Sequence, residues 1–428
     1  MKRRTFFFAG AALAAASSAS AQRAVAPSDR VNVGLVGVGG RGRGLTHEFL
    51  NLNDVNVAWL CDVDQASLER AQKVVDEAGA KRPPTTDDMR RVFEDRDIDA
   101  VVIATPDHWH APATLLALEA GKDVYVEKPC SHNIREGRMM VDAARHHQRI
   151  VQMGVQRRSA PTFQRAIQMV HDGKLGKVRA AKAWDCQMRD DIGHKPDGPV
   201  PAGVDYDTYL GPAPWIPFNP NRFHYNWHWH WHFGTGDAGN DGVHHMDMAR
   251  WALNVSAPHT ASGMGRKAYF DDDQQTPDTM NVTLDYGEKL LLWEMRIWNP
   301  YGIEDGVENG MAVYGDDAQL QIGRWNRKEG YRLIDKQGKI VETVFLEPGE
   351  MVAHQRNFVD CVKSRELPNC DIGQGHLSTL CAHLANIVAR CDRTIKFDVE
   401  TETVIDDQQA NLYVGRKYRT HWATPKGA

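Results

Sequence analysis

A short segment near the start of the chain, Val31 to Gly42 (VNVGLVGVGGRG), constrains the fold more than any other. Its apolar residues predict a buried β-strand, and residues 43–52 are helix-like. Three glycines between them fit the G-x-G-x-x-G pattern, in which the tight turn, the approach of a pyrophosphate and helix–strand packing each need a glycine. We therefore predict a dinucleotide site at the start of the helix, with these residues in contact: Gly37, Gly39, Gly40, Arg41 and Gly42.

An acidic residue follows at the expected distance. Residues 55–60 predict a second apolar strand, and Asp62 stands at its end, twenty residues beyond Gly42. A carboxylate there accepts hydrogen bonds from ribose hydroxyls and repels a 2′-phosphate, so Asp62 favours NAD over NADP. The alternative is that Asp62 caps the helix that comes next.

Composition excludes several classes of protein. With 428 residues, 42% of them hydrophobic, the chain is long enough for two globular domains. Its formal charge is −5 and it has no block of basic residues, which argues against nucleic acid or an anionic membrane surface as a partner. The seven cysteines show no C-x-x-C pair, so we expect buried thiols and no disulfide framework.

The first 21 residues read as a targeting signal. Lys2, Arg3 and Arg4 precede aromatic residues and a weakly apolar run, and Ala19-Ser20-Ala21 supplies a cleavage pattern. The paired arginines resemble a twin-arginine signal, which implies export to the periplasm after folding. The run is too short to span a bilayer, so no membrane association is expected once the signal is removed.

The rest of the chain divides into two patterns. Residues 30–155 alternate apolar strands with helices, which predicts an α/β Rossmann domain whose parallel sheet is covered on both faces. From residue 156 to 428, alternating strands and a few helices predict an α+β domain with an open, mostly antiparallel sheet. Ligands of parallel sheets bind at the carboxyl ends of the strands, where three polar segments lie: Thr105 to His110, Glu127-Lys128-Pro129 and Gly154 to Arg157.

Six motifs in this order resemble the Gfo/Idh/MocA oxidoreductases, relatives of glucose–fructose oxidoreductase and inositol dehydrogenase. They are GVGGRG, Asp62, ATPDHWH, EKP, GVQRR and the G-x-H-x-x-D of residues 242–247. The resemblance covers the whole mature chain, and EKP with G-x-H-x-x-D is its most specific part. It implies a sugar-like substrate in a cleft between the domains, and a C-terminal sheet that forms a homodimer or homotetramer.

The resemblance also implies which residues carry the chemistry. Glu127 and Lys128 would lie beside the nicotinamide ribose. Lys128 would also reach the substrate hydroxyl, and His244 would accept its proton. Asp247 follows His244 at the predicted start of a helix (246–253), where an acid can be purely structural. The family usually carries aspartate four residues before the histidine, and here that residue is Asn240, which cannot take a proton.

Further contacts are predicted at the strand ends. The cofactor is expected to touch Thr105, Pro106, Asp107, His110 and Gln156, although Asp107 could instead cap a helix. The residues predicted to bind substrate are Arg157, Tyr225, His228, His230, Asp241 and His245.

The run from Phe223 to His232 alternates histidine and tryptophan and allows three interpretations. On a strand, His228, His230 and His232 would share one face. Aromatic rings stack on sugars and histidines bind hydroxyls, so a sugar-cleft lining comes first and a structural role second. Zinc comes last, because no carboxylate or cysteine nearby completes a ligand set.

Two enzymatic functions follow. The first is an exported NAD-dependent oxidoreductase that transfers hydride from a sugar ring carbon to tightly held nicotinamide. The alternative is a redox-neutral glycosidase like glycoside hydrolase family 109, in which transient oxidation at C3 permits elimination at C2. Asn240 keeps that alternative open, whereas the lysine of EKP, which that branch replaces, argues against it. A binding protein without activity fits least, because the glycines, Asp62, Lys128 and His244 are all present.

Overall fold

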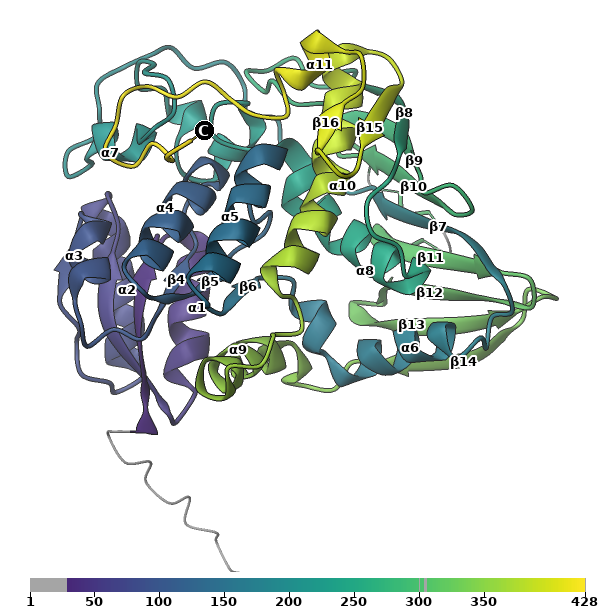
Figure 1. The fold of residues 1–428 in the computed structure, drawn as a ribbon, viewed down its shortest axis with the longest axis horizontal. Coiled ribbons are helices and arrows are strands. Elements are labelled where there is room, and N and C mark those ends of the chain that lie inside the picture. Colours follow the sequence, from purple (N-terminus) through teal and green to yellow (C-terminus); the bar gives the residue numbers. More distant parts are fainter. Residues whose placement is uncertain (1–28, 300, 304–305, 428) are drawn as a thin grey trace, which may run out of the picture.

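The computed structural model describes residues 29–299, 301–303 and 306–427; the predicted targeting signal lies outside them. Two sheets lie at opposite sides of the molecule with helices between and around them (Figure 1). The first third of the chain forms one sheet, and the remainder forms the other and then returns to the first. Both the Rossmann fold and the mostly antiparallel second sheet were predicted from the sequence, and both are confirmed.

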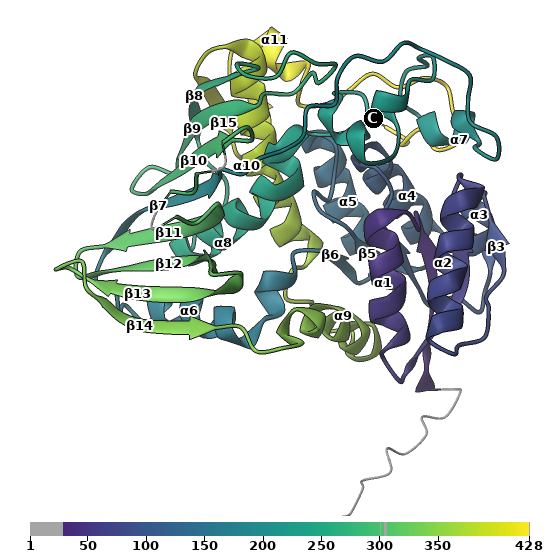
Figure 2. The same ribbon diagram turned by 180° about the vertical axis from the view of Figure 1, so that it is seen from behind.

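The first sheet has six parallel strands in the order β3-β2-β1-β4-β5-β6. Its strands are β1 (Val31–Val36), β2 (Val55–Cys61), β3 (Thr85–Thr86), β4 (Ala100–Ile103), β5 (Asp123–Val126) and β6 (Val151–Met153). Its helices are α1 (Gly40–Leu50), α2 (Gln65–Glu77), α3 (Met89–Glu94), α4 (Asp107–Glu119) and α5 (Ile134–His146). Figure 1 views the face covered by α4 and α5, and Figure 2 the opposite face, covered by α1 and α2. Because both faces are covered, β4 and β5 are entirely buried and apolar runs suffice to form them.

The second sheet has ten strands in the order β14-β13-β12-β11-β7-β10-β9-β8-β15-β16. They are β7 (Val178–Asp185), β8 (Thr260–Arg266), β9 (Thr279–Asp285), β10 (Leu290–Arg296), β11 (Asn309–Gly315), β12 (Ala318–Trp325), β13 (Lys328–Asp335), β14 (Ile340–Phe345), β15 (Ile395–Asp398) and β16 (Thr403–Val404). Among the described strands of this second sheet, β7 and β10 are the one pair that runs parallel, and the other pairs are antiparallel. One face packs against α6 (Pro161–His171) and α8 (Val243–Leu253) in the largest apolar core. On β10 the residues alternate between buried and partly exposed, as expected for a sheet with one covered face.

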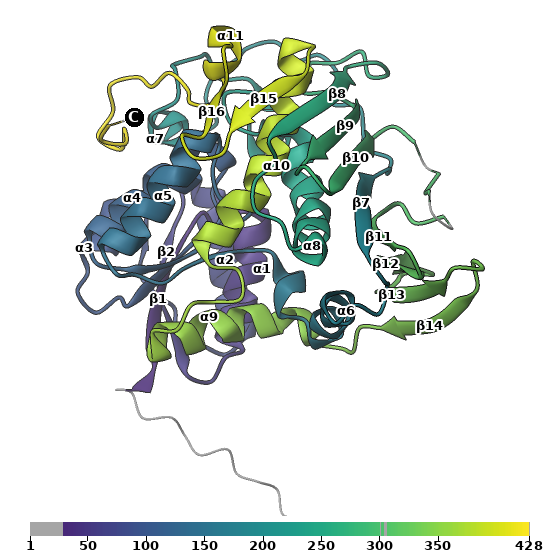
Figure 3. The same ribbon diagram turned by 45° about the vertical axis from the view of Figure 1, so that its right-hand side comes forward.

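Two late helices bind the sheets together. Helix α9 (Ala353–Ser364) inserts Phe358 among Phe49 and Tyr125 of the Rossmann core. Helix α10 (Ile372–Cys391) packs on both α5 and β8, and Figure 3 shows it running between the two sheets. The two sheets are therefore held together by helices that follow the whole Rossmann sheet and strands β7 to β14 of the second sheet.

The proline-rich segment between β7 and α8 has little regular structure and folds over the Rossmann sheet. It contains α7 (Tyr206–Leu210), and the indole Nε1 of Trp109 in α4 donates to the carbonyl of Tyr209 at 3.0 Å. A later segment holds the outside of this loop, because Arg419 donates to the carbonyl of Gly211 at 2.6 Å and to the carboxylate of Asp207 at 2.6 Å. The remaining short helices are α11 (Gln408–Asn411) and the 3₁₀ turns η2 (Gln156–Ser159), η3 (Pro220–Arg222), η4 (His224–Trp229) and η6 (Glu350–Val352).

The strand considered for the histidine–tryptophan run is wrong. Residues His224–Trp229 form the 3₁₀ turn η4, which starts at a positive φ of 48° at His224. A 3₁₀ helix has three residues per turn and no strand follows it in this run, so the alternation of faces that a strand would give His228, His230 and His232 is absent.

Two further sequence expectations concern cysteines and membranes. All seven cysteines are buried free thiols. Within the described residues, no helix has the length and apolar character needed to cross a membrane.

Candidate active site

The glycine-rich turn has the shape that a dinucleotide needs. Gly37 adopts φ +80°, and a Cβ on it would lie 2.7 Å from the backbone of Ala104. A Cβ on Gly42 would lie only 1.8 Å from the carbonyl oxygen of Gly37, so this glycine lets α1 pack on β1. By contrast, a Cβ on Gly39 or Gly40 would meet nothing within 4 Å. The open space is at the N-terminus of α1, where a pyrophosphate would be held by free N–H groups.

Asp62 lies at the end of β2 with its carboxylate fixed by the backbone. Its two oxygens accept N–H groups from Val38 at 2.8 Å and Asp64 at 3.0 Å. The helix cap that the sequence left possible for Asp62 is supplied by Asp64, which accepts the N–H of Ala66. Burial raises the pKa of Asp62 to about 6, so the carboxylate is charged at neutral pH. This arrangement fits a ribose diol better than a 2′-phosphate.

A pocket of about 440 Å³ runs from the glycine turn to Asn240, in the segment just before α8. It is lined by all the residues predicted to touch the cofactor except Gly42 and Gln156. The proline-rich loop adds a wall formed by Thr208, Tyr209, Phe223, His224, Tyr225 and Trp227. The sequence predicted a cleft lining from the run that begins at Phe223, but not the part formed by Thr208 and Tyr209. The volume and open glycine turn fit a bound dinucleotide.

Glu127, at the carboxyl end of β5, is held in a charged network. Its carboxylate accepts from Arg41 Nε at 2.8 Å, and Arg41 also pairs with Glu48 at 2.8 Å. Burial works to raise the pKa of Glu127, but Arg41 and Lys128 outweigh it and lower this pKa. Gln156 donates to Tyr125 Oη at 3.2 Å and to Glu127 at 3.4 Å, which places it behind the pocket wall.

Lys128 lines the pocket and joins the Rossmann domain to the segment just before α8. Its ammonium donates to the backbone carbonyl of Asn240 at 2.9 Å and to the Asn240 side-chain oxygen at 3.1 Å. The Asn240 amide in turn donates to Asp237 at 3.0 Å. Two of the three ammonium hydrogens are used in these contacts, which leaves one for a substrate oxygen.

His244 lies in the first turn of α8, next to this contact. Burial, together with the charges of Lys128 and Arg157, lowers the pKa of His244 well below its usual value, while Asp241 opposes them. The imidazole is therefore neutral at physiological pH and can accept a proton. The neighbouring His245 is turned away, because its Nδ1 pairs with Arg157 at 2.9 Å and Arg157 also binds Glu329 at 2.6 Å.

The segment after β4, residues 105–110, forms part of the pocket wall and connects it to the end of β5. The ring nitrogens of His110 lie 2.6 Å from the Pro129 carbonyl and 2.9 Å from the Thr105 carbonyl, so His110 links two strand ends. Asp107 begins α4 without capping it; it accepts from Thr235 at 2.7 Å, and burial raises its pKa to about 7. Pro106 lines the same wall.

Asp247 has the structural role that the sequence left open. Helix α8 begins at Val243 and not at residue 246, so Asp247 lies in its second turn, away from the free N–H groups. The carboxylate is fully buried and pairs with Arg158 at 2.9 Å and with Ser378 at 2.5 Å. It thereby ties α8 to α10.

The predicted substrate contacts from the aromatic run occupy different positions. Tyr225 is 61% exposed at the pocket mouth and accepts from Arg189 at 3.1 Å. His228 and His230 are buried, at 2% and 3% exposure. The Nε2 atom of His228 has no hydrogen-bond partner among the described residues. Burial lowers the pKa of His228; the charge of Lys128 adds to this effect and that of Asp241 opposes it.

Four polar residues near Lys128 were not predicted as site residues: Asp185, Gln187, Arg189 and Asp237. Asp185 ends β7, and Gln187 and Arg189 follow it into the loop. Gln187 donates to Asp241, and Arg189 donates to both Asp237 and Asp241 in the segment before α8. Of these four residues, only Asp237 could have been suspected from the sequence, because it lies three residues before Asn240. The other three could not, since nothing in a single sequence indicates that residues 185 to 189 contact residues 237 and 241.

Family comparisons agree with this geometry. Residues 31–155 match the family described as "Oxidoreductase family, NAD-binding Rossmann fold". Residues 182–284 and 336–424 match "Oxidoreductase family, C-terminal alpha/beta domain" of the same Gfo/Idh/MocA group.

Relatives and solved structures are similar in part. A glycosyl hydrolase family 109 protein of Shewanella sp. (strain ANA-3) is 39% identical over 125 residues, 28% of this chain and 27% of the relative. Matches to other family 109 proteins span up to 36% of their length. The aldose-aldose oxidoreductase of Caulobacter crescentus, complexed with glycerol, aligns at TM-score 0.67 and 17% identity, over 86% of this chain and all of that one. The WlbA dehydrogenase of Bordetella pertussis, in complex with NADH and UDP-GlcNAcA, aligns at 0.65 and 17% identity, over 86% of this chain and 99% of that one.

The two family matches, the fold and the open glycine turn above Asp62 lead to one conclusion. The chain belongs to the Gfo/Idh/MocA oxidoreductases, with an NAD-binding Rossmann domain.

Proposed function

We propose that this protein oxidises a secondary alcohol of a sugar or glycoside, with NAD as the hydride acceptor. The observation that carries the proposal is the position of Lys128, which lies at the rim of the cofactor pocket and is anchored on Asn240, four residues before His244. Bound NAD would take the hydride from the ring carbon. The names of relatives and structural neighbours, which include sugar oxidoreductases, support a carbohydrate substrate.

The chain's own residues would manage the charge and the proton. The Lys128 ammonium stabilises the alkoxide that develops as the hydroxyl proton leaves, and neutral His244 receives that proton. Asn240 holds the ammonium by two contacts, so its orientation is set before substrate binds. The surrounding polar side chains, including exposed Tyr225, offer contacts to the other sugar hydroxyls.

A redox-neutral glycosidase is the second candidate, favoured by the 39% identity to glycosyl hydrolase family 109 proteins. That match covers 125 to 133 residues, less than a third of either chain. It therefore supports a shared way of binding NAD more strongly than a shared reaction.

One experiment separates the two candidates. The purified enzyme is denatured and the released nucleotide assayed, and native enzyme is then incubated with nitrophenyl glycosides while NADH and nitrophenol are followed together. Bound NAD that becomes reduced without nitrophenol release supports the oxidoreductase. Nitrophenol release without lasting NADH supports the glycosidase. Absence of nucleotide, with no binding of added NAD, would contradict both.

We also propose export by the twin-arginine route, from Arg3 and Arg4 and the Ala19-Ser20-Ala21 pattern. Replacing both arginines by lysine is expected to retain the protein in the cytoplasm, as measured by cell fractionation. An unchanged periplasmic fraction would refute this.

Finally, we propose that the face of the second sheet opposite α6 and α8 forms a homodimer or homotetramer. On β10 this face carries Leu290, which is 39% exposed, and Leu292. Light scattering of wild type and Leu290→Glu tests it, with a smaller mass expected for the variant. A wild-type mass of one chain would exclude the oligomer.

A further inference from the structure

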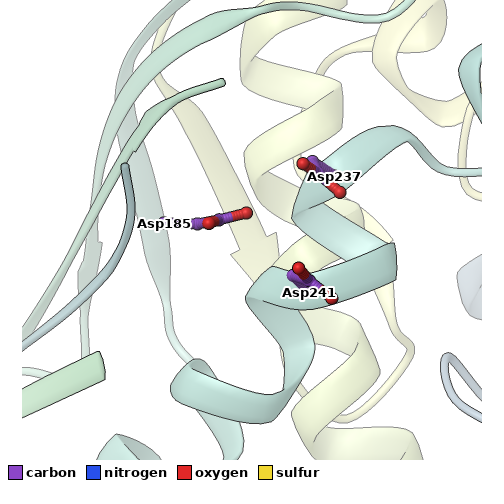
Figure 4. Close-up of side chains that lie close together, drawn as sticks. All are labelled: Asp185, Asp237 and Asp241. Carbon is purple, nitrogen blue, oxygen red and sulfur yellow. The ribbon is translucent and has the colours of Figure 1, made fainter. Parts of the chain in front are cut away.

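Three carboxylates meet beside Lys128 and His244. Asp185 comes from the end of β7. Asp241 lies in the π-helical segment η5 (Ala238–Gly242), and Asp237 is the residue just before this segment. One oxygen from each lies within 4.8 Å of the others, and Figure 4 shows the three side chains converging from two elements. Asp185 and Asp237 are fully buried.

The donors around this cluster are unevenly distributed. Arg189 donates to both oxygens of Asp237 at 3.0 Å and to Asp241 at 2.7 Å. Gln187 donates to Asp185 Oδ1 and to Asp241 Oδ2, each at 2.7 Å. Oδ2 of Asp185 is buried and has no partner among the described residues. A buried carboxylate oxygen without a donor is costly, so something must compensate it.

Charge balance favours a proton over a metal ion. Three negative charges face the single guanidinium of Arg189, with the ammonium of Lys128 nearby on the Asn240 side. A divalent cation requires several oxygen ligands, yet N–H donors already point at both oxygens of Asp237 and at one oxygen each of Asp185 and Asp241. A single proton neutralises one charge and needs no further ligand.

We propose that Asp185 keeps a proton in the working enzyme and donates it as a hydrogen bond to the Asp237–Asp241 pair, so that the proton stays on Asp185 and Asp241 stays ionised beside His244. Burial and the charges of Asp237 and Asp241 raise the pKa of Asp185, whereas Arg189 and Lys128 lower that of Asp241 against its burial. Anionic Asp241 opposes the positive charges that depress the pKa of His244. Asp185 is thus a positioning residue, and Asp241 supplies the negative charge that Asn240 cannot.

The catalytic part of this inference rests on the proposed function, but the proton itself can be tested without any sugar. The infrared difference spectrum of NAD-loaded wild type minus Asp185→Asn at neutral pH is expected to show a protonated-carboxyl C=O band that shifts in heavy water. The contribution of Asp107, whose pKa is about 7, is common to both proteins and cancels. Asp237→Asn removes one neighbouring charge, so the band should then disappear at a lower pH. Absence of the band from this difference spectrum would overturn the proposal. So would a stoichiometric divalent metal in wild type that Asp185→Asn loses.

The role in catalysis has its own readout, by rescue. Asp185→Ala is expected to lower kcat by at least about tenfold with little change in KM, because His244 becomes a weaker base. Asp185→Asn retains an N–H donor and should recover most of that loss. Asp316→Asn, in an exposed pair with Arg179 at 3.1 Å, is the control. Equal losses in the Ala and Asn variants would contradict a donor role.

Discussion

Asn240 shows why one side chain differs from its family pattern. Both ends of its amide are used, with the oxygen accepting from Lys128 at 3.1 Å and the nitrogen donating to Asp237 at 3.0 Å. An aspartate in the same place would turn an acceptor toward Asp237. The asparagine therefore supplies an N–H donor that Asp237 needs and that an aspartate would lack. It also avoids a further negative charge next to Asp237 and Asp241.

Asn240→Asp should consequently destabilise the protein. The lost donor and the added negative charge next to buried Asp237 are expected to cost about 1–3 kcal/mol in the free energy of unfolding at neutral pH. Urea denaturation measures this, with Asn51→Asp on the exposed end of α1 as the control. A variant as stable as wild type would show that Asp237 is not charged.

Lys128→Ala is expected to reduce turnover by about 100-fold, the usual effect of losing one stabilising donor at a developing oxyanion. The nucleotide content should stay near that of wild type, because the glycine turn and Asp62 remain intact. Steady-state kinetics and nucleotide release measure the two quantities. Lys182→Ala, which removes an ion pair with Glu294 on the far sheet, should change neither.

Asp62→Ser should weaken the preference for NAD over NADP by roughly tenfold, about 1.4 kcal/mol. The same preference should fall in wild type below about pH 6, where Asp62 takes up a proton and no longer repels a 2′-phosphate. Fluorescence titrations with both nucleotides at pH 5 and pH 8 test this. A preference independent of pH would mean that the charge of Asp62 does not discriminate.

At the scale of elements, the glycine turn contains one glycine that helix packing needs, Gly42, and one that faces the open pocket, Gly39. Gly42→Ala forces a Cβ to within 1.8 Å of the Gly37 carbonyl, so α1 must move off β1 and the thermal midpoint should fall. Gly39→Ala places its methyl in open space, so the fold should be unaffected while NAD binding weakens. Thermal unfolding and nucleotide content distinguish the two. The interpretation fails if Gly39→Ala lowers the midpoint as much as Gly42→Ala.

Elements with strong patterns could be predicted from the sequence, and irregular ones could not. The buried strands β1, β2, β4 and β5 and the glycine turn follow from local residue patterns. The 3₁₀ turn η4 did not, because alternating rings are compatible with a strand and its positive φ at His224 leaves no sequence signal. Asp185 and Arg189 were missed for another reason: their contacts with residues 237 and 241 depend on how β7 meets η5.

At the scale of the whole molecule, a late helix secures the Rossmann sheet. Arg356 and Lys363 of α9 both bind Asp54, just before β2. Although burial opposes it, these hydrogen bonds lower the pKa of Asp54 to about 2. This folded value lies below the unfolded value of about 3.9, so the stabilisation exists above pH 4 and is lost as the pH falls toward 2.

Asp54→Asn should therefore be less stable than wild type at neutral pH, and the difference should shrink between pH 4 and pH 2. Chemical denaturation across this range provides the measurement, with exposed Asp142→Asn as the control. A difference that stays constant down to pH 2 would contradict the assignment of the low pKa to Asp54.

The C-terminal segment that carries Arg419, called the strap below, has a consequence for biosynthesis because Arg419 binds the proline-rich loop. It fixes Asp207 and Gly211, on either side of the pocket wall at Thr208 and Tyr209, yet it is translated 212 residues after Asp207. While the ribosome is still adding these residues, the wall lacks its outer support and the cofactor can enter or leave. Retention of the nucleotide thus becomes an event that follows synthesis of the strap, and a nascent chain stalled before residue 419 should release NAD far faster than the finished protein.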